Sequence, residues 1–158
     1  MNFQWEDGDV VFGELDEFWT ELLRRLPESA AVYDEPAQRR LFGGPTGGKD
    51  PEADADWKDV VEPELRELFD SHIDVVERDL QNLRELDGES SLRVAADHLR
   101  AWVHTLNQAR LAIGARNGIT EEDMEGRRAF DTQEKGFAML QIEVYGLVLG
   151  FLLRHLDL

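Results

Sequence analysis

The sequence predicts a mainly α-helical single domain, a bundle of about five helices with an N-terminal β-hairpin. Two observations predict this class. Apolar residues recur every three or four positions over most of the chain, as in helices that bury one face. The first dozen residues differ, because strand-forming residues flank Asp7-Gly8 there. With 158 residues, the chain is long enough to form one domain, 1–158, around its own core.

We expect residues 3–12, FQWEDGDVVF, to form the hairpin, because Asp-Gly favours a tight type I′ turn. Two strands are marginally stable alone, so this hairpin must pack against the helical bundle, residues 14–156. The first helix begins near Glu14 and is ended by Pro27. Its apolar stripe comprises Leu15, Phe18, Trp19, Leu22, Leu23 and Leu26.

A glycine-rich loop, residues 43–51 (GGPTGGKDP), is predicted between helices over 35–41 and 54–61. The loop contains G-x-x-x-x-G-K, the spacing of a phosphate-binding loop. However, Asp50 stands where that motif needs a magnesium-binding hydroxyl, and no buried strand precedes the loop. We therefore interpret the match as chance.

The second half of the chain predicts three longer helices. They cover residues 63–86, 90–116 and 132–155. Asp87-Gly88 is expected to stop the first, and Ser90 or Ser91 to cap the second.

Asn117-Gly118 is expected to break the second of these helices, after which Thr120 caps a short turn through Met124. The last helix contains an apolar run from Val144 to Leu153, which is ten residues long. A membrane span needs about 20, so we interpret this segment as a core helix.

Charge and composition exclude several classes of partner and site. The 34 acidic and 17 basic residues give a net charge of −17, which repels duplex DNA, RNA and anionic membranes but leaves a basic protein partner open. The absence of cysteine excludes disulfides, thiol catalysis and zinc–thiolate sites. The N-terminus, MNFQWEDGD, has neither the basic nor the apolar region of a secretion signal, so we expect a cytoplasmic protein.

Arg110 lies in an apolar stripe, where its charge needs a partner or a solvated opening. The other members of that stripe are Leu92, Ala96, Leu99, Val103, Leu106 and Ile113. We predict that Arg110 pairs with Asp79 or Glu143. The candidate pocket or structural polar cluster comprises Arg110, Asn107, Asp79, His72 and Glu143. The cluster either fixes the helices in register or binds a small anionic or polar ligand.

The sequence offers no catalytic residues. The histidines do not form H-E-x-x-H or an E-x-x-H pair, so we expect no metal and no cofactor; they are His72, His98, His104 and His155. Neither a G-x-S-x-G elbow nor a G-x-G-x-x-G fingerprint occurs. The residues therefore favour a non-enzymatic protein, and an enzyme is the alternative.

Gly146 and Gly150 form a G-x-x-x-G step on the last helix, which allows another helix to approach closely. This face either packs within the chain or forms a candidate homodimer seam.

Three blocks carry a resemblance to a family: DEPAQRRLF at residues 34–42, DPEADADW at 50–57, and the stretch 102–123. With them the chain resembles the bacterial, largely actinobacterial, domain-of-unknown-function family number two thousand seventeen. The loop after Phe42 is richer in glycine than the usual linker of that family. The resemblance implies a small, mainly helical cytoplasmic protein without an assigned activity. Members are often encoded near an adaptor of the Clp protease, which implies a partner in regulated proteolysis.

Two functions remain open from the sequence. The first is a non-enzymatic cytoplasmic binding or regulatory module that acts through protein–protein contacts, with a link to Clp-type proteolysis and with homodimerisation as one form of contact. The alternative is a small-molecule-binding protein, or an enzyme, with an internal polar pocket around Arg110 and Asn107.

Overall fold

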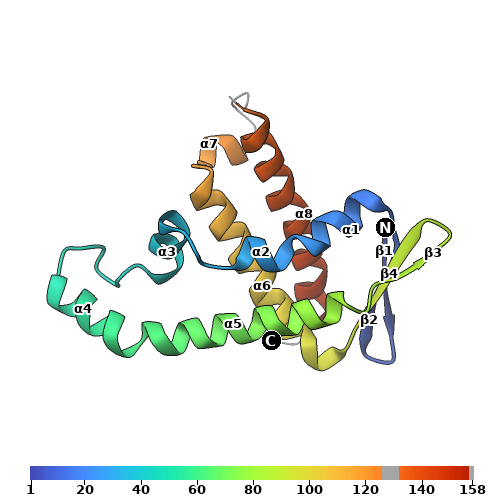
Figure 1. The fold of residues 1–158 in the computed structure, drawn as a ribbon, viewed down its shortest axis with the longest axis horizontal. Helices are drawn as coiled ribbons and strands as arrows, with labels where there is room; N and C mark the ends of the chain where they lie inside the picture. The colour runs from blue at the N-terminus through green and yellow to red at the C-terminus, as the bar shows by residue number, and fades with distance from the viewer. Residues whose placement is uncertain (126–131, 157–158) are drawn as a thin grey trace.

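The structure is a computed structural model that describes residues 1–125 and 132–156, without the side chain of His155. Helices α6 (Leu99–Arg116) and α8 (Gln133–His155) pack against each other at its centre, and a four-stranded sheet lies at one side (Figure 1). The mainly helical class and the N-terminal hairpin are therefore confirmed. The hairpin, however, is half of a larger sheet.

The first hairpin consists of β1 (Asn2–Glu6) and β2 (Asp9–Leu15). Asp7 and Gly8 both have positive φ, 53° and 88°, as the predicted type I′ turn requires. Two aromatic contacts hold the hairpin on the helices. The ring of Phe12 meets that of Trp102 on α6 at 5.6 Å, and Phe3 stacks on Phe151 of α8 at 4.3 Å.

A second hairpin, β3 (Arg84–Leu86) and β4 (Glu89–Val94), was not expected. Strand β4 pairs with β2, and the sheet order is β1-β2-β4-β3. Asp87 and Gly88, expected to stop a helix, form its turn with φ of 54° and 80°. The segment folds as strands because β2 offers its backbone groups a partner and buries Leu92 and Val94.

Two predicted boundaries are wrong as a result. Helix α5 (Glu62–Leu80) ends before the hairpin, and α6 begins only after a 3₁₀ turn, η1 (Ala96–His98). Ser90 and Ser91 belong to β4 and cap no helix. Leu92 and Ala96 are therefore not part of the α6 stripe that contains Arg110.

The first predicted helix is interrupted before Pro27. Helix α1 (Glu17–Arg24) ends, and α2 (Leu26–Ala30) begins with Pro27 in its first turn, where a missing N–H costs nothing. Helices α3 (Glu35–Phe42), α4 (Pro51–Val60) and α7 (Glu121–Met124) lie where the sequence placed helices or a helical turn. The short helices raise the count above the predicted five or so.

The carboxylate of Asp54 organises the glycine-rich loop. It accepts hydrogen bonds from the Thr46 N–H (3.0 Å), the Thr46 hydroxyl (2.9 Å) and the Gly48 N–H (2.8 Å). The Thr46 N–H is the main cause that lowers the pKa of Asp54. A side chain of the protein thus takes the loop N–H groups that a phosphate-binding loop directs at its ligand.

Arg116, near the end of α6, holds the extended segment between α2 and α3. Its guanidinium donates to the carboxylate of Asp34 (2.8 Å) and to the carbonyls of Ser29 (2.7 Å) and Ala31. It also lies over the ring of Tyr33, at 4.6 Å. These contacts satisfy one carbonyl in the last turn of α2 and one directly after it, which no described helix or strand satisfies.

Two further buried side chains fix neighbouring backbone. The Gln108 amide donates to the carbonyl of Ala30 (2.6 Å), and the Tyr145 hydroxyl donates to that of Leu22 (2.6 Å). Helices α6 and α8 therefore hold α1 and α2 by specific hydrogen bonds as well as by apolar packing.

Among the described residues, one helix is long and apolar enough to cross a membrane. This is α8, and half of its apolar window is buried inside the protein.

Replacing Arg116 with methionine should reduce the free energy of unfolding by about 2–4 kcal/mol, because Asp34 and two carbonyls lose their donor. Urea denaturation measures this change. Arg100→Met is the matched control, since Arg100 is exposed on the same helix; its effect should stay within about 0.5 kcal/mol. Equal effects of the two substitutions would show that the Arg116 contacts contribute nothing specific.

Candidate ligand-binding site

A surface cleft of about 500 Å³ lies between α3, α6, α7 and α8. Its volume is within the range of ligand pockets, about 300–1,000 Å³. Arg40 of α3 and Arg110 of α6 line it together with Asn107. Its apolar wall comprises Leu111, Ile119, Met124 and Ile142.

The C-terminus of α6 forms one rim of the cleft through a Schellman motif. The Ile119 N–H donates to the carbonyl of Gly114 at 3.0 Å, and Gly118 takes the left-handed conformation with φ of 59°. The predicted break at Asn117-Gly118 is confirmed. The motif turns the chain back so that Ile119 and Thr120 face the cleft.

Asp123 holds the short helix α7 at the other rim. It forms the capping box with Thr120 and an ion pair with Lys135 of α8 (3.0 Å), while its side chain is buried. The Thr120 N–H, followed by Lys135, lowers the pKa of Asp123 to about 2. The predicted cap at Thr120 is confirmed.

Arg110 is half-buried and lies across α8. Its Nε donates to the carbonyl of Ile142 (3.2 Å). Its guanidinium lies where a Cβ on Gly146 would come within 3.3 Å, so glycine at this position makes room for it. Gly146 thus faces a side chain of the same chain.

The predicted ion pair of Arg110 with Asp79 or Glu143 is wrong. Within residues 1–125 and 132–156, neither Arg110 nor Arg40 has a carboxylate within 4 Å. Glu143 is exposed on α8 and forms no ion pair with Arg110 among the described residues. Glu121 also lines the cleft, but among the described residues it forms no ion pair with either arginine. The two guanidinium groups of the cleft therefore lack an ion-pair partner in the described chain.

Asp79 is buried at the end of α5 and binds the beginning of α6 instead. Its carboxylate accepts a hydrogen bond from Trp102 Nε1 (2.8 Å) and lies 2.9 Å from Nδ1 of His98. The sequence analysis placed Asp79 in the polar cluster around Arg110 and missed both of its partners. The spacing of His98 and Trp102, one helical turn apart, is the signal that could have found them.

His72 is also outside the cleft. Its ring stacks on that of His104 at 4.7 Å, and its buried Nδ1 has no hydrogen-bond partner in the described part of the chain. Burial, and then the charge of His104, lower the pKa of His72. Of the five residues in the predicted cluster, the cleft brings together only Arg110 and Asn107.

Sequence reasoning missed Arg40, which α3 brings to the cleft from the DEPAQRRLF block. The rest of the cleft comes mostly from the block 102–123. That both blocks belong to the family pattern is the signal that could have pointed to Arg40. In the described ranges, no group of three or more His, Asp or Glu side chains is placed to hold a metal ion.

Fold and cleft together define a small, mainly helical domain with an arginine-lined surface cleft. A family model matches residues 3–156, and the chain belongs to the family described as Domain of unknown function (DUF2017). The resemblance found in the sequence is thus confirmed over nearly the whole chain. Comparison with curated proteins and with solved structures gave no match.

The low pKa of Asp123 predicts acid sensitivity. Because the folded-state pKa is about 2, below the ordinary 3.8, Asp123 contributes stability that is present above pH 4 or so and is lost as the pH falls towards 2. Asp123→Asn should therefore lower stability at neutral pH and flatten its dependence between about pH 4 and 2. Urea titrations at several pH values measure both effects. The exposed Asp97→Asn should leave the acid limb unchanged; an equal change there would refute the assignment.

His72 predicts a second pH dependence, at milder pH. Its folded-state pKa is lowered, so below its ordinary value of about 6.5 the unfolded chain binds a proton that the folded chain does not. Stability should therefore fall as the pH drops from 7 to 5, and less so in His72→Gln. Denaturant unfolding at the two pH values tests this. An equal change in the free energy of unfolding between pH 7 and pH 5 in both proteins would disprove it.

Proposed function

We propose that this protein is a non-enzymatic binding module whose cleft takes a ligand with one acidic group and an apolar body. One observation carries the proposal: Arg40 and Arg110 line the same cleft without a carboxylate partner in the described residues, although the chain has 34 acidic and 17 basic residues. An unpaired guanidinium beside an apolar wall is a favourable environment for the acidic group of such a ligand.

The hydrogen bond of Arg110 to α8 uses only one of its three guanidinium nitrogens. Nε is used by the Ile142 carbonyl, so the two terminal nitrogens remain for a bidentate contact with a carboxylate or phosphate. This anchored arginine is the positioning element, and the exposed Arg40 closes the site from α3. Asn107 supplies an amide that can donate or accept.

The overall charge restricts the ligand further. At −17 the protein repels polyanions, so a single acidic group joined to an apolar body fits better than a polyphosphate or a nucleotide. The cleft opens to solvent, and the acidic group can therefore belong to a small carboxylate or to the end of a partner chain.

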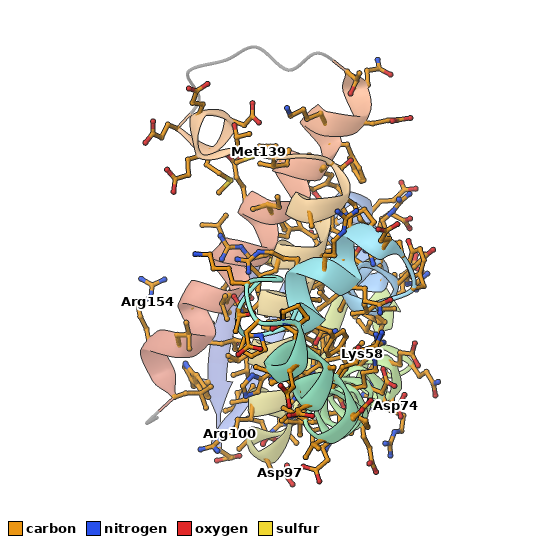
Figure 2. The ribbon with its side chains drawn as sticks, turned by 90° about the vertical axis from the view of Figure 1, so that its left-hand side faces the viewer. Lys58, Asp74, Asp97, Arg100, Met139 and Arg154 are labelled. Atoms are coloured by element: carbon orange, nitrogen blue, oxygen red, sulfur yellow. The ribbon has the colours of Figure 1, made fainter. Side chains whose placement is uncertain are left out.

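Isothermal titration with two probes tests the proposal: octanoate, and a short peptide that ends in a free leucine carboxylate. Binding should weaken at least tenfold in Arg110→Lys, because lysine lacks the planar fork, and in Arg40→Ala. Arg100→Ala is the control. Arg100 lies far from Met139 (Figure 2), which is one turn before the cleft residue Ile142 on α8, so this variant should bind the probes as the wild type does.

The two probes distinguish a metabolite from a protein ligand. Binding of the peptide but not of its C-terminal amide, with no binding of octanoate, would favour a partner chain. If neither probe shifts the wild-type protein, or if both variants bind as it does, the cleft is not the binding site.

A second candidate is protein contact through the acidic arm, defined as α4 and the first half of α5. The arm extends away from the body of the molecule (Figure 1), and Val60 and Leu68 are 70% and 50% exposed on it. Its acidic side chains outnumber its basic ones, which favours a basic amphipathic segment as the partner. The family resemblance adds a component of Clp-type proteolysis as a partner to seek.

Capture experiments separate this candidate from the cleft. A partner that is lost with Val60→Glu and Leu68→Glu, but retained with Arg110→Lys, would bind the arm. The reverse pattern would assign the partner to the cleft.

A further inference from the structure

One face of α8 is uncovered although it is apolar. Leu147 is 63% exposed, and Leu140, two turns before it on the same side of the helix, is 37% exposed. Glu143 and Arg154 lie on the same side, and Arg154 points away from the body of the molecule (Figure 2). An apolar stripe between two opposite charges is typical of a contact surface.

The residues of this face have the spacing of a two-helix seam. Positions Glu143, Leu147, Gly150 and Arg154 follow each other at intervals of four, three and four, as the a and d positions of a heptad do. No described atom lies within 4 Å of a Cβ built on Gly150, so this glycine leaves an open notch. Gly146 does not contribute, because it faces Arg110 inside the chain.

We propose that two copies of this chain pair antiparallel through this face of α8. The two-fold axis then passes beside Val148 and Leu149. In this register Leu147 of each copy fills the notch at Gly150 of the other, and Glu143 of each copy meets Arg154 of the other. The face is self-complementary, as an isologous interface must be.

Charge supports a second copy over other occupants. Glu143 makes no ion pair within the described residues, and Arg154 donates only to the carbonyl of Gly150 on its own helix, at 3.2 Å. Antiparallel pairing forms two equivalent ion pairs, each between Glu143 of one copy and Arg154 of the other. Parallel pairing would instead set Glu143 against Glu143 and Arg154 against Arg154. A membrane surface would have to accept Glu143 and a net charge of −17.

Disulfide trapping tests the register directly, because the chain has no cysteine. In the proposed dimer, Glu143→Cys places its two thiols about 16 Å apart along the helix axis, far beyond disulfide reach, and Arg154→Cys does the same. Neither variant should cross-link alone. A mixture of the two should form a disulfide dimer, which still keeps one Glu143–Arg154 pair.

Other trapping results would overturn the proposal. Self-cross-linking of either variant would mean parallel or non-specific contact. If no cross-link forms in the mixture under mild oxidation, the faces do not meet.

Charge reversal tests the same contact without cysteine. By analytical ultracentrifugation, Glu143→Arg and Arg154→Glu should each weaken the dimer about tenfold or more, and the double variant should recover to within about threefold of the wild type. Gly150→Leu should also dissociate it by filling the notch. Arg100→Glu is the control and should leave the dimer intact, while circular dichroism checks the fold of every variant.

A wild-type protein that stays monomeric at about 100 μM overturns the dimer. Sedimentation with phosphatidylcholine–phosphatidylglycerol vesicles then identifies a membrane as the occupant, if Leu147→Glu abolishes it.

Discussion

Three carbonyls at the end of α2 and directly after it, those of Ser29, Ala30 and Ala31, accept no hydrogen bond from the backbone of a helix or strand within the described residues. Arg116 and Gln108 of α6 provide the donors instead, and Arg116 adds an ion pair with Asp34, the cap of α3. This constraint sets the path of the chain across the face of α6. It also fixes where α3 begins, and thereby where Arg40 reaches the cleft. The arrangement of the helices around the cleft depends on these few polar contacts.

The two arginines of α6 have divided roles that the sequence analysis did not anticipate. All three nitrogens of the Arg116 guanidinium donate hydrogen bonds within the chain, whereas Arg110 makes one hydrogen bond, to the carbonyl of Ile142. The apolar stripe singled out Arg110, because a charge among apolar residues is conspicuous. The same stripe gave no information on its partner, since the partner depends on how α6 and α8 pack. At Gly146, α8 has no side chain, and the guanidinium of Arg110 occupies the space beside it.

Features that depend on residues close in sequence were predicted correctly from the sequence. The turn at Asp7-Gly8, the cap at Thr120 and the end of α6 at Gly118 all depend on residues close in sequence, and each was predicted correctly. Strand β4 was missed because it pairs with β2, so that Val94 lies opposite Val10. The partners of Asp79 were missed for the same reason, because they depend on how α5 packs against α6. Arg110 and Asn107 were grouped correctly, since residues three apart on a helix are neighbours whatever else packs there.

The order of the sheet has a consequence for aggregation. Strands β1 and β3 are its edges, and exposed edges are templates for pairing with foreign strands. Strand β3 is only three residues long, every residue is exposed, and two of them, Arg84 and Glu85, are charged. Phe3 of β1 is stacked beneath Phe151 of α8, which ties that edge to the helices. The second hairpin therefore places a short strand with two charged side chains at one edge of the sheet, which disfavours pairing with other chains, and Leu86, 77% exposed, is the apolar side chain of that edge.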